Sequence, residues 1–394
     1  MTKVCMLAVQ HCAKDDRIFY KEALSLKKHG FDVYYLHGAE PDGSIVDLGG
    51  NILNPNGEKE IDIDGIKIIG IPHAKGLIQK TLNKMNQSNF YKEIIKVGIE
   101  LNADVYHAHE PQSLYIAQKI EENITTKVIY DAHEPWINAH KKDALLRTIL
   151  LPKLKYLISA NQITRGDLVF HNHQIKSEVV YNCSSPDVFF PEFNQEKLKT
   201  PVIVHEGSMK FDRGLKEIIE VIKCLKPKHP AIKFKIVGET YNEERAYLAS
   251  KIKEYALEDN IIETGWLTYE NVGDELKNCS IGLITNTSIE RNTLAGPANK
   301  FFNYLTYGIA CVAVDLPETT ALLRNTKSGI TIQERTIEKL SEAIDTLLAD
   351  KDRLSNYCEK AYEAYQQYNW KNEEQKLISF YKHVVLNEKG VQFY

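Results

Sequence analysis

The sequence lacks three features that would assign the protein to a specific class. Its seven cysteines contain no C-x-x-C pair, which makes a zinc site or a redox motif improbable on spacing. It has no basic excess, because 49 Lys and Arg stand against 53 Asp and Glu, and the formal charge of -4 argues against a nucleic-acid partner. No uncharged apolar run approaches the ~20 residues that span a membrane. We therefore expect a globular, cytoplasmic protein.

The cysteines are predicted to be reduced and buried. Their number is odd and several stand in apolar, strand-like runs, as is typical of structural cysteines in a cytosolic protein. The N-terminal stretch Met1–Val9 is predicted to be a strand. It is too short for a signal peptide, and charged residues follow from Lys14 onward.

The length of 394 residues predicts two domains of similar size. In both halves short β-branched runs alternate with helix-period segments, which predicts the α/β class with parallel, doubly wound sheets. A hairpin around Asp64-Gly65 interrupts this alternation. The predicted strands are Val4–Val9, Asp32–Leu36, Asp104–His107, Lys127–Tyr130, Asp167–Phe170, Val179–Tyr181, Val202–Gly207, Phe234–Val237, Asn260–Glu263, Ile281–Ile284 and Cys311–Val314.

A polar stretch around Pro186–Pro191 separates the two arrays and predicts a linker near residue 190. We expect one Rossmann-like domain over residues 1–190 and a second over residues 191–369, with their carboxyl sheet ends around one cleft. Ligands of doubly wound sheets bind outside the carboxyl ends of the strands. The unusual residues that follow strands are therefore the candidates for function.

Two His-Glu-Pro tripeptides follow successive strands of the first array. They are His109-Glu110-Pro111, with His107 two residues earlier, and His133-Glu134-Pro135. Imidazoles and carboxylates at one rim can supply acid–base chemistry or bind sugar hydroxyls. A hydrogen-bonded core histidine is the alternative, and for His107 it is equally plausible. No metal is expected, because no third ligand stands at a recognisable spacing.

The second array opens with a strand, a glycine-bearing loop and a helix start, Gly207-Ser208-Met209-Lys210-Phe211-Asp212-Arg213-Gly214. Such a loop predicts an anion site, in which backbone N–H groups and the side chains of Lys210 and Arg213 meet phosphate. The spacing matches neither a Walker loop nor the dinucleotide fingerprint. The simpler alternative is that Arg213 is a solvated residue at the start of the helix and binds no ligand.

A further dense segment begins at Gly296-Pro297-Ala298-Asn299-Lys300 and continues through Asn303. Pro297 suits the first turn of a helix, on which Lys300 and Asn303 lie about one turn apart on one face. Both side chains could address a ligand, although an exposed surface lysine is the alternative for Lys300.

Taken together, these motifs resemble the family 4-type glycosyltransferases, whose GT-B fold consists of two facing Rossmann-like domains. The resemblance spans nearly the whole chain and depends on the order and spacing of the motifs rather than on any one of them. They are Asp16-Arg17-Ile18, His107–Pro111, Tyr181-Asn182, Arg213-Gly214, Pro297–Tyr304 and Asn369-Trp370.

The resemblance implies a role for each matching position. Arg213 would neutralise the diphosphate of a sugar nucleotide, UDP- or GDP-linked, with Gly207 and Lys210 in the same loop and with Lys300 and Asn303 lining the donor pocket. His109 or His107 would lie at the reaction centre, and Asp16, His133 and Glu134 on the acceptor side. The family usually retains the anomeric configuration without a metal or another cofactor. The final helix, residues 370–394, would pack back on the first domain.

The sequence also departs from the family pattern. Many relatives carry two glutamates separated by seven residues in this helix region, and here Ala295 and Asn303 occupy those positions. Asparagine still accepts a hydrogen bond through its carbonyl but carries no charge. Ser208 stands where a basic residue often follows the loop glycine.

The acceptor is expected to be a glycan or a lipid-linked molecule, in surface polysaccharide or glycolipid synthesis. Two basic segments, Lys75–Lys96 and Lys141–Arg165, could lie on an anionic bilayer, although core helices with solvated lysines explain them as well. Two other functions stay open: a sugar-nucleotide epimerase on the same fold, and a non-catalytic partner subunit that has lost donor chemistry.

Overall fold

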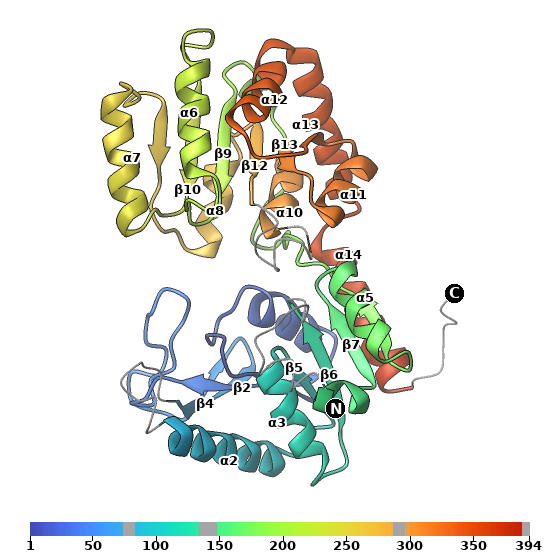
Figure 1. The fold of residues 1–394 in the computed structure, drawn as a ribbon. Coiled ribbons are helices and arrows are strands. Elements are labelled where there is room, and N and C mark those ends of the chain that lie inside the picture. The colour runs from blue at the N-terminus through green and yellow to red at the C-terminus, as the bar shows by residue number, and fades with distance from the viewer. Residues whose placement is uncertain (74–82, 134–147, 287–295, 297, 388–394) are drawn as a thin grey trace. The chain divides into compact units, whose positions relative to one another are not determined.

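The computed structural model describes residues 1–73, 83–133, 148–286, 296 and 298–387, which form two compact units (Figure 1). The first unit is Met1–Tyr181 together with the segment that begins at Glu373, and the second unit is Asn182–Asn372. Each unit contains one largely parallel sheet. The predicted α/β class with two doubly wound sheets is confirmed.

The sheet of the first unit has the strand order β3-β4-β2-β1-β5-β6-β7-β8. Only β3 and β4 pair antiparallel among the described strands, as the predicted hairpin at Asp64-Gly65 requires, and both residues have positive φ. The strands are β1 (Lys3–Ala8), β2 (Asp32–Ala39), β3 (Glu60–Ile63), β4 (Ile66–Pro72), β5 (Val105–Ala108), β6 (Lys127–Ala132), β7 (Tyr156–Ser159) and β8 (Lys176–Val179).

The helices of this unit cover an apolar sheet whose central strands β1 and β5 are almost entirely buried. Burial on both faces is what favours continuous apolar strands such as Val-Cys-Met-Leu-Ala in β1. The helical segments are η1 (Ile18–Ala23), α1 (Leu24–Lys28), α2 (Asn83–Leu101), α3 (Pro111–Glu121), η3 (Leu151–Lys153), α5 (Gln162–His171), η5 (Phe380–Val385) and, from Glu373 onward, α14 (Trp370–Ser379). Of these, η1 and η5 are π-helical and η3 is a 3₁₀-helix.

One predicted strand of the first unit is wrong. Asp167–Phe170 belongs to helix α5, because the Asn161 side chain accepts a hydrogen bond from Thr164 N–H at 2.8 Å and so starts a helix there. The strand of this region is instead β7, which the sequence analysis missed. The last strand, β8, lies three residues before the predicted one at Val179–Tyr181.

The sheet of the second unit has the order β11-β10-β9-β12-β13-β14, with all neighbours parallel. Five of its strands confirm the prediction, and β14 is an addition at the edge. The strands are β9 (Val202–Glu206), β10 (Lys233–Val237), β11 (Ile261–Glu263), β12 (Ile281–Ile284), β13 (Ala310–Val314) and β14 (Gly329–Ile332).

Helix α6 shows how this unit builds its core. Its apolar residues recur at helical spacing, so that Leu215, Ile218, Ile219 and Ile222 are all fully buried in one cluster with the strands. The helices of this unit are η4 (Gln195–Leu198), α6 (Leu215–Leu225), α7 (Asn242–Glu254), α8 (Tyr269–Leu276), α10 (Asn299–Thr306), α11 (Pro317–Thr326), α12 (Ile337–Ala349) and α13 (Lys351–Tyr365).

The C-terminal region is helical with the predicted interruption, because α13 ends at Tyr365 and α14 begins at Trp370. The seven cysteines all lie in the described residues and none of them forms a disulfide. Five are buried, Cys12 is partly exposed and Cys224 is exposed, so the expectation of buried cysteines is wrong for these two. Among the described helices, none combines the length and the hydropathy needed to cross a bilayer.

Candidate functional site

The polar residues of the first unit gather at the carboxyl ends of β1, β5 and β6, where the sequence predicts them. Neighbouring strands β1 and β5, and β5 and β6, run parallel, so the residues that follow them reach the same edge. His109 follows β5, and Asp131 and His133 lie at the end of β6. Arg17 and Glu22 come from the loop after β1 and from η1.

Arg17 is the central cation of this edge. Its guanidinium donates to both carboxylate oxygens of Asp131, from Nε at 2.9 Å and from Nη2 at 3.1 Å, and Nη1 donates to the carbonyl of Val180 at 2.9 Å. The side chains of Arg17 and Asp131 are 4% and 0% exposed. Burial would raise the pKa of Asp131, but the Arg17 charge outweighs it and holds that pKa well below its usual range.

Glu22 is a second buried carboxyl beside the same guanidinium, with Oε1 2.9 Å from Arg17 Nε. Burial and the neighbouring Asp131 charge together outweigh Arg17 and raise the pKa of Glu22 well above its usual value. One arginine thus balances the charge of one carboxylate, and the other carboxyl keeps its proton.

Three histidines, His107, His109 and His133, lie next to one another at the same edge of the sheet. The rings of His107 and His109 stack with centroids 4.6 Å apart, and the Tyr381 hydroxyl from η5 lies 2.9 Å from His107 Nδ1. Nε2 of His133 lies 3.3 Å from His109 Nδ1 and 3.3 Å from Asp131 Oδ2. Burial lowers the pKa of His107 well below its usual value and that of His109 to about 4, so both rings are neutral at pH 7.

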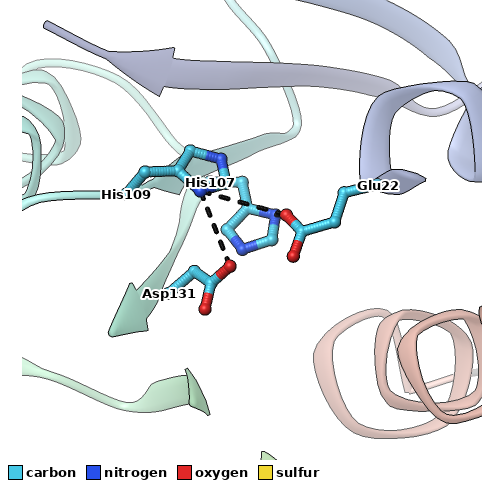
Figure 2. A group of neighbouring side chains, drawn as sticks. All are labelled: Glu22, His107, His109 and Asp131. Atoms are coloured by element: carbon cyan, nitrogen blue, oxygen red, sulfur yellow. Dashed lines mark ion pairs between the residues drawn. The ribbon is translucent and has the colours of Figure 1, made fainter. Parts of the chain in front are cut away.

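The side chains of Glu22, His107, His109 and Asp131 also form a group that could hold a metal ion (Figure 2). One donor atom from each lies within 4.8 Å of the others. The sequence argument against a metal is therefore wrong in its reason, because the third and fourth donors come from separate elements. Arg17 nevertheless lies against both carboxyls, and its positive charge opposes a cation at this position.

Asp16, His133 and Glu134 were predicted on the acceptor side. His133 retains a side-chain exposure of 20%, so it is a partly accessible neighbour of the buried Asp131. Asp16 is partly exposed, with Oδ2 3.7 Å from Lys21 Nζ. Glu134 lies outside the described residues.

Sequence reasoning missed His11, which also belongs to this edge. Its Nδ1 lies 2.9 Å from Asp15 Oδ2, and its ring meets that of His133 at 5.3 Å. Burial opposes protonation, but the bond to Asp15 and the charge of Glu110 prevail and raise the pKa of His11 to about 9. Its place just after β1 matches that of His109 after β5, a signal that could have identified it.

In the second unit the predicted anion loop follows β9. Gly207 and Gly238 have φ of +91° and +147°, and a Cβ on Gly238 would meet the Gly207 carbonyl oxygen at 2.5 Å, so their backbones approach as only glycine allows. Arg213 folds onto this loop, and its Nη1 donates to the carbonyl and the hydroxyl oxygen of Ser208 at 2.8 and 2.9 Å. Lys210 is exposed.

Two groups hold the backbone at Arg213. The Thr285 hydroxyl donates to the Arg213 carbonyl at 2.5 Å. Arg335 donates to the carbonyls of Asp212 and Thr285, the latter at 2.9 Å, and to Glu217 Oε1 on α6 at 3.1 Å. The loop that carries Arg213 is thus tied to β12 and to the first turn of α6.

Helix α10 brings Lys300 and Asn303 to the same end of the sheet. Lys300 Nζ lies 3.3 Å from His205 Nε2 on β9, and Asn303 Nδ2 donates to Glu206 Oε1 at 2.7 Å. Burial, with the nearby Arg213 charge, lowers the pKa of Lys300 to about 7. The alternative of an exposed surface lysine is wrong, because Lys300 is buried. Ala295, the other departure from the family pattern, lies outside the described residues.

Of the predicted residues, His107, His109 and His133 are therefore neighbours in the first unit. In the second unit Gly207 and Arg213 share one loop, and Lys300 and Asn303 flank the end of β9. The remaining neighbours could not be identified as partners from spacing, because each is distant in sequence from a residue that it contacts. They are Arg17, Glu22, Asp131, His205 and Glu206.

Comparisons with known proteins agree with this architecture. Residues 189–364 match the family described as Glycosyl transferases group 1. No curated protein sequence matches the chain. The solved structure of sucrose-phosphate synthase from Thermosynechococcus elongatus superposes with a TM-score of 0.75 at 11% identity, over 98% of this chain and 100% of that one.

Two further structures are similar over their full length. Alr3699/HepE from Anabaena, in complex with UDP, gives a TM-score of 0.72 at 12% identity and covers 96% of this chain and 99% of that one. WaaG, a glycosyltransferase involved in lipopolysaccharide biosynthesis, gives 0.63 at 12% identity over 96% and 99%. The protein therefore has the GT-B glycosyltransferase fold, and residues 189–364 of its second unit are similar to the group 1 glycosyltransferases.

The protonated state of Glu22 can be tested with Glu22→Gln. A carboxyl whose pKa is raised by folding contributes stability at low pH and loses it as pH rises through and beyond the unfolded-state value near 4.3. Glutamine keeps the neutral shape without this loss. We expect the variant to match the wild type at pH 4 and to have a higher free energy of unfolding than the wild type at pH 8, because the raised pKa of Glu22 makes its ionisation in the folded state unfavourable.

Chemical denaturation at both pH values measures this difference, with the exposed Glu258→Gln as a control that should change nothing. Equal destabilisation of Glu22→Gln at both pH values would instead show an ionised Glu22 paired with Arg17.

Proposed function

We propose that the protein transfers a sugar from a nucleoside-diphosphate sugar to a glycan or lipid-linked acceptor, with retention of the anomeric configuration and without a metal. The observation that carries this proposal is the anion site at the carboxyl end of β9, where Arg213, the glycine loop and the start of α6 meet. Breaking the bond to the sugar leaves negative charge on a diphosphate, and preorganised cations and N–H groups stabilise that charge.

The structural relatives support the donor class. Alr3699/HepE has been solved in complex with UDP and also with UDP-glucose. On this basis we propose a UDP-linked donor, with a GDP-linked donor as the alternative. The involvement of WaaG in lipopolysaccharide biosynthesis supports a role in surface polysaccharide or glycolipid assembly.

In this proposal the first unit supplies the reaction centre. His109 is a neutral imidazole at pH 7, and its contacts to Asp131 and His133 fix its ring. A neutral imidazole can accept a hydrogen bond from a sugar hydroxyl or donate one to it, depending on its tautomer. Asp16 and His133, both partly exposed, are proposed on the acceptor side with Glu134, and His107 supports His109 by ring stacking.

Calorimetric titration with UDP, GDP, ADP and CMP tests the donor site. We expect one nucleotide to bind selectively and Arg213→Ala to weaken it by tenfold or more, because hydrogen bonds to charged groups contribute about 1.5–3 kcal/mol. Arg245→Ala, which replaces an arginine on α7, is the matched control. Unchanged affinity in Arg213→Ala would exclude its role, and a folded protein that binds no nucleotide would favour the non-catalytic partner subunit.

His109→Ala tests the reaction centre. We expect turnover to fall by a factor of about 10²–10⁴, the usual contribution of a positioned proton-transfer group, while nucleotide affinity stays at the wild-type value. Transfer of radiolabel from the donor sugar measures turnover. Wild-type turnover in the variant would remove His109 from the reaction centre. Product formed without any acceptor would point to the epimerase instead.

The proposed location is the cytoplasmic side of a membrane that carries the acceptor. Phe170, at the end of α5, is 72% exposed and Ile149 is 48% exposed. Asn172 Nδ2 donates to the carbonyls of Leu151 and Leu154 at 2.8 and 3.2 Å, which holds the end of α5 against the segment that follows Ile149. Exposed apolar residues beside lysines favour an anionic bilayer.

Sedimentation with vesicles that contain an anionic lipid tests this contact. We expect Phe170→Ala to reduce the bound fraction, while Phe190→Ala, which removes a phenylalanine of similar exposure (73%) from the second unit, leaves it unchanged. Equal binding of all three proteins, or no binding of the wild type, would contradict a membrane contact through this surface.

A further inference from the structure

Among the described residues of the first unit, two segments are π-helical, and each places a side chain beside His107. π-helical segments are rare in proteins and are frequently found at functional sites. Glu22 belongs to η1, and its Oε2 lies 4.0 Å from His107 Nδ1. Tyr381 belongs to η5, and its hydroxyl lies 2.9 Å from the same nitrogen. The proposed function uses the histidines but assigns no role to Tyr381.

The position of η5 is fixed by hydrogen bonds and packing within the first unit. Leu386 N–H donates to the Tyr381 carbonyl at 2.9 Å, across the five-residue spacing of a π-helix. Lys127 Nζ, at the start of β6, donates to the Val385 carbonyl, one of the carbonyls that a helix end leaves without an intrahelical partner. The Tyr381 ring is fully buried and lies edge-on to Phe31 with centroids 5.6 Å apart. These contacts define where the Tyr381 hydroxyl lies.

His107 depends on this hydroxyl for its orientation. The χ2 torsion of a histidine has broad minima, so contacts rather than rotamer preference fix the plane of the ring. Within the described part of the chain, the Tyr381 hydroxyl is the one hydrogen-bond partner of the His107 ring. Nε2 is buried without a partner, and Glu22 Oε2 is too far from Nδ1 for a hydrogen bond. Burial raises the pKa of Tyr381 well above its usual value, so the hydroxyl keeps its proton at neutral pH.

His107 in turn sets the plane of the His109 ring. The two rings stack with centroids 4.6 Å apart and an angle of 29° between their planes (Figure 2). At one edge of the His109 ring, Nδ1 lies 3.5 Å from Asp131 Oδ2 and 3.3 Å from His133 Nε2. Its Nε2 is buried and has no hydrogen-bond partner among the described residues. A change in the position of His107 would therefore tilt His109 and change the direction in which Nε2 points.

We propose that Tyr381 is a positioning residue for the transfer reaction: its hydroxyl holds His107, and the stacked His107 fixes the imidazole of His109 at the reaction centre. The inference rests on the proposed function and adds to the first unit's reaction centre a residue from near the end of the chain. Because Tyr381 binds His107 rather than a ligand, its hydroxyl is expected to affect the rate of transfer and not the affinity for the donor.

A purely structural role of Tyr381 would depend on its ring rather than on its hydroxyl. Tyr381→Phe keeps the ring and its contact with Phe31 and removes the hydrogen bond to His107. Tyr106→Phe is the matched control, because Tyr106 precedes His107 on β5, is also fully buried and donates its hydroxyl to the Gly98 carbonyl. Successive residues of a strand face opposite sides of the sheet, so this hydroxyl lies away from His107.

The kinetic test uses the full chain and measures the nucleoside diphosphate released from UDP-glucose or GDP-glucose, with a glycolipid extract as acceptor. In Tyr381→Phe we expect kcat to fall by about fivefold or more at unchanged KM for the donor, as the loss of one net hydrogen bond predicts. We expect Tyr106→Phe to keep the wild-type kcat and KM. Wild-type kcat in Tyr381→Phe, or an equal loss in Tyr106→Phe, would overturn the inference.

A double-mutant cycle tests whether Tyr381 acts through His107. His107→Phe keeps an aromatic ring in the stack and removes both ring nitrogens. We expect the double variant to have the same kcat as His107→Phe alone, because the hydroxyl then has no partner to position. Losses that multiply in the double variant would show that Tyr381 acts independently of His107, which contradicts the inference.

The imidazole ¹⁵N resonances of the full chain test the same contacts without a substrate. We expect the ring signals of both His107 and His109 to shift in Tyr381→Phe, and those of His109 to stay unchanged in Tyr106→Phe. A shift of His107 alone would show that the stack does not transmit the change, and would overturn the inference while leaving the proposed function intact. A folded wild type that releases no nucleoside diphosphate from either donor would contradict the proposed function, and the positioning role with it.

Discussion

The buried pairing of Arg17 with Asp131 is the interaction on which the first unit's polar edge depends. A buried charge is tolerated only when it is paired and hydrogen-bonded, and loss of one partner typically costs about 3–5 kcal/mol. This single guanidinium joins the loop after β1, the end of β6 and the carbonyl of Val180. With Asp131 ionised and Glu22 protonated, His107 and His109 remain close-packed and neutral, while His11 at the same edge keeps its proton beside Asp15.

The second unit solves a different electrostatic problem. Arg213 of the loop, the start of α6 and Lys300 of α10 lie at one end of the sheet. Such an arrangement suits a diphosphate. Burial lowers the pKa of Lys300 to about 7, so a bound anion needs to add little interaction energy to keep this lysine protonated at neutral pH. Arg335 and Thr285 hold the loop before any ligand arrives, and such preorganisation reduces the entropy lost on binding.

Much of the fold could be predicted because buried parallel strands are apolar along their whole length and begin and end at turn residues. The errors had local causes: at Asp167–Phe170 the Asn161 cap favoured a helix, and the short edge strand β14 gives a weak signal. At the sites, residues directly after strands were predictable. Their partners were not, since Arg17 meets Asp131 across 114 positions and Asn303 meets Glu206 across 97. Pairs so distant in the sequence can be identified only from the folded structure.

The most direct test of the proposed donor site is hydrogen–deuterium exchange of the full chain with and without UDP, GDP or ADP at saturating concentration. We expect one of them to slow exchange in the peptides that contain residues 205–216 and 298–306, where the anion loop and α10 lie, and to leave α12 and α13 unchanged. Slowed exchange confined to other segments, or no change with any of the three nucleotides, would contradict a nucleotide site at the carboxyl end of β9.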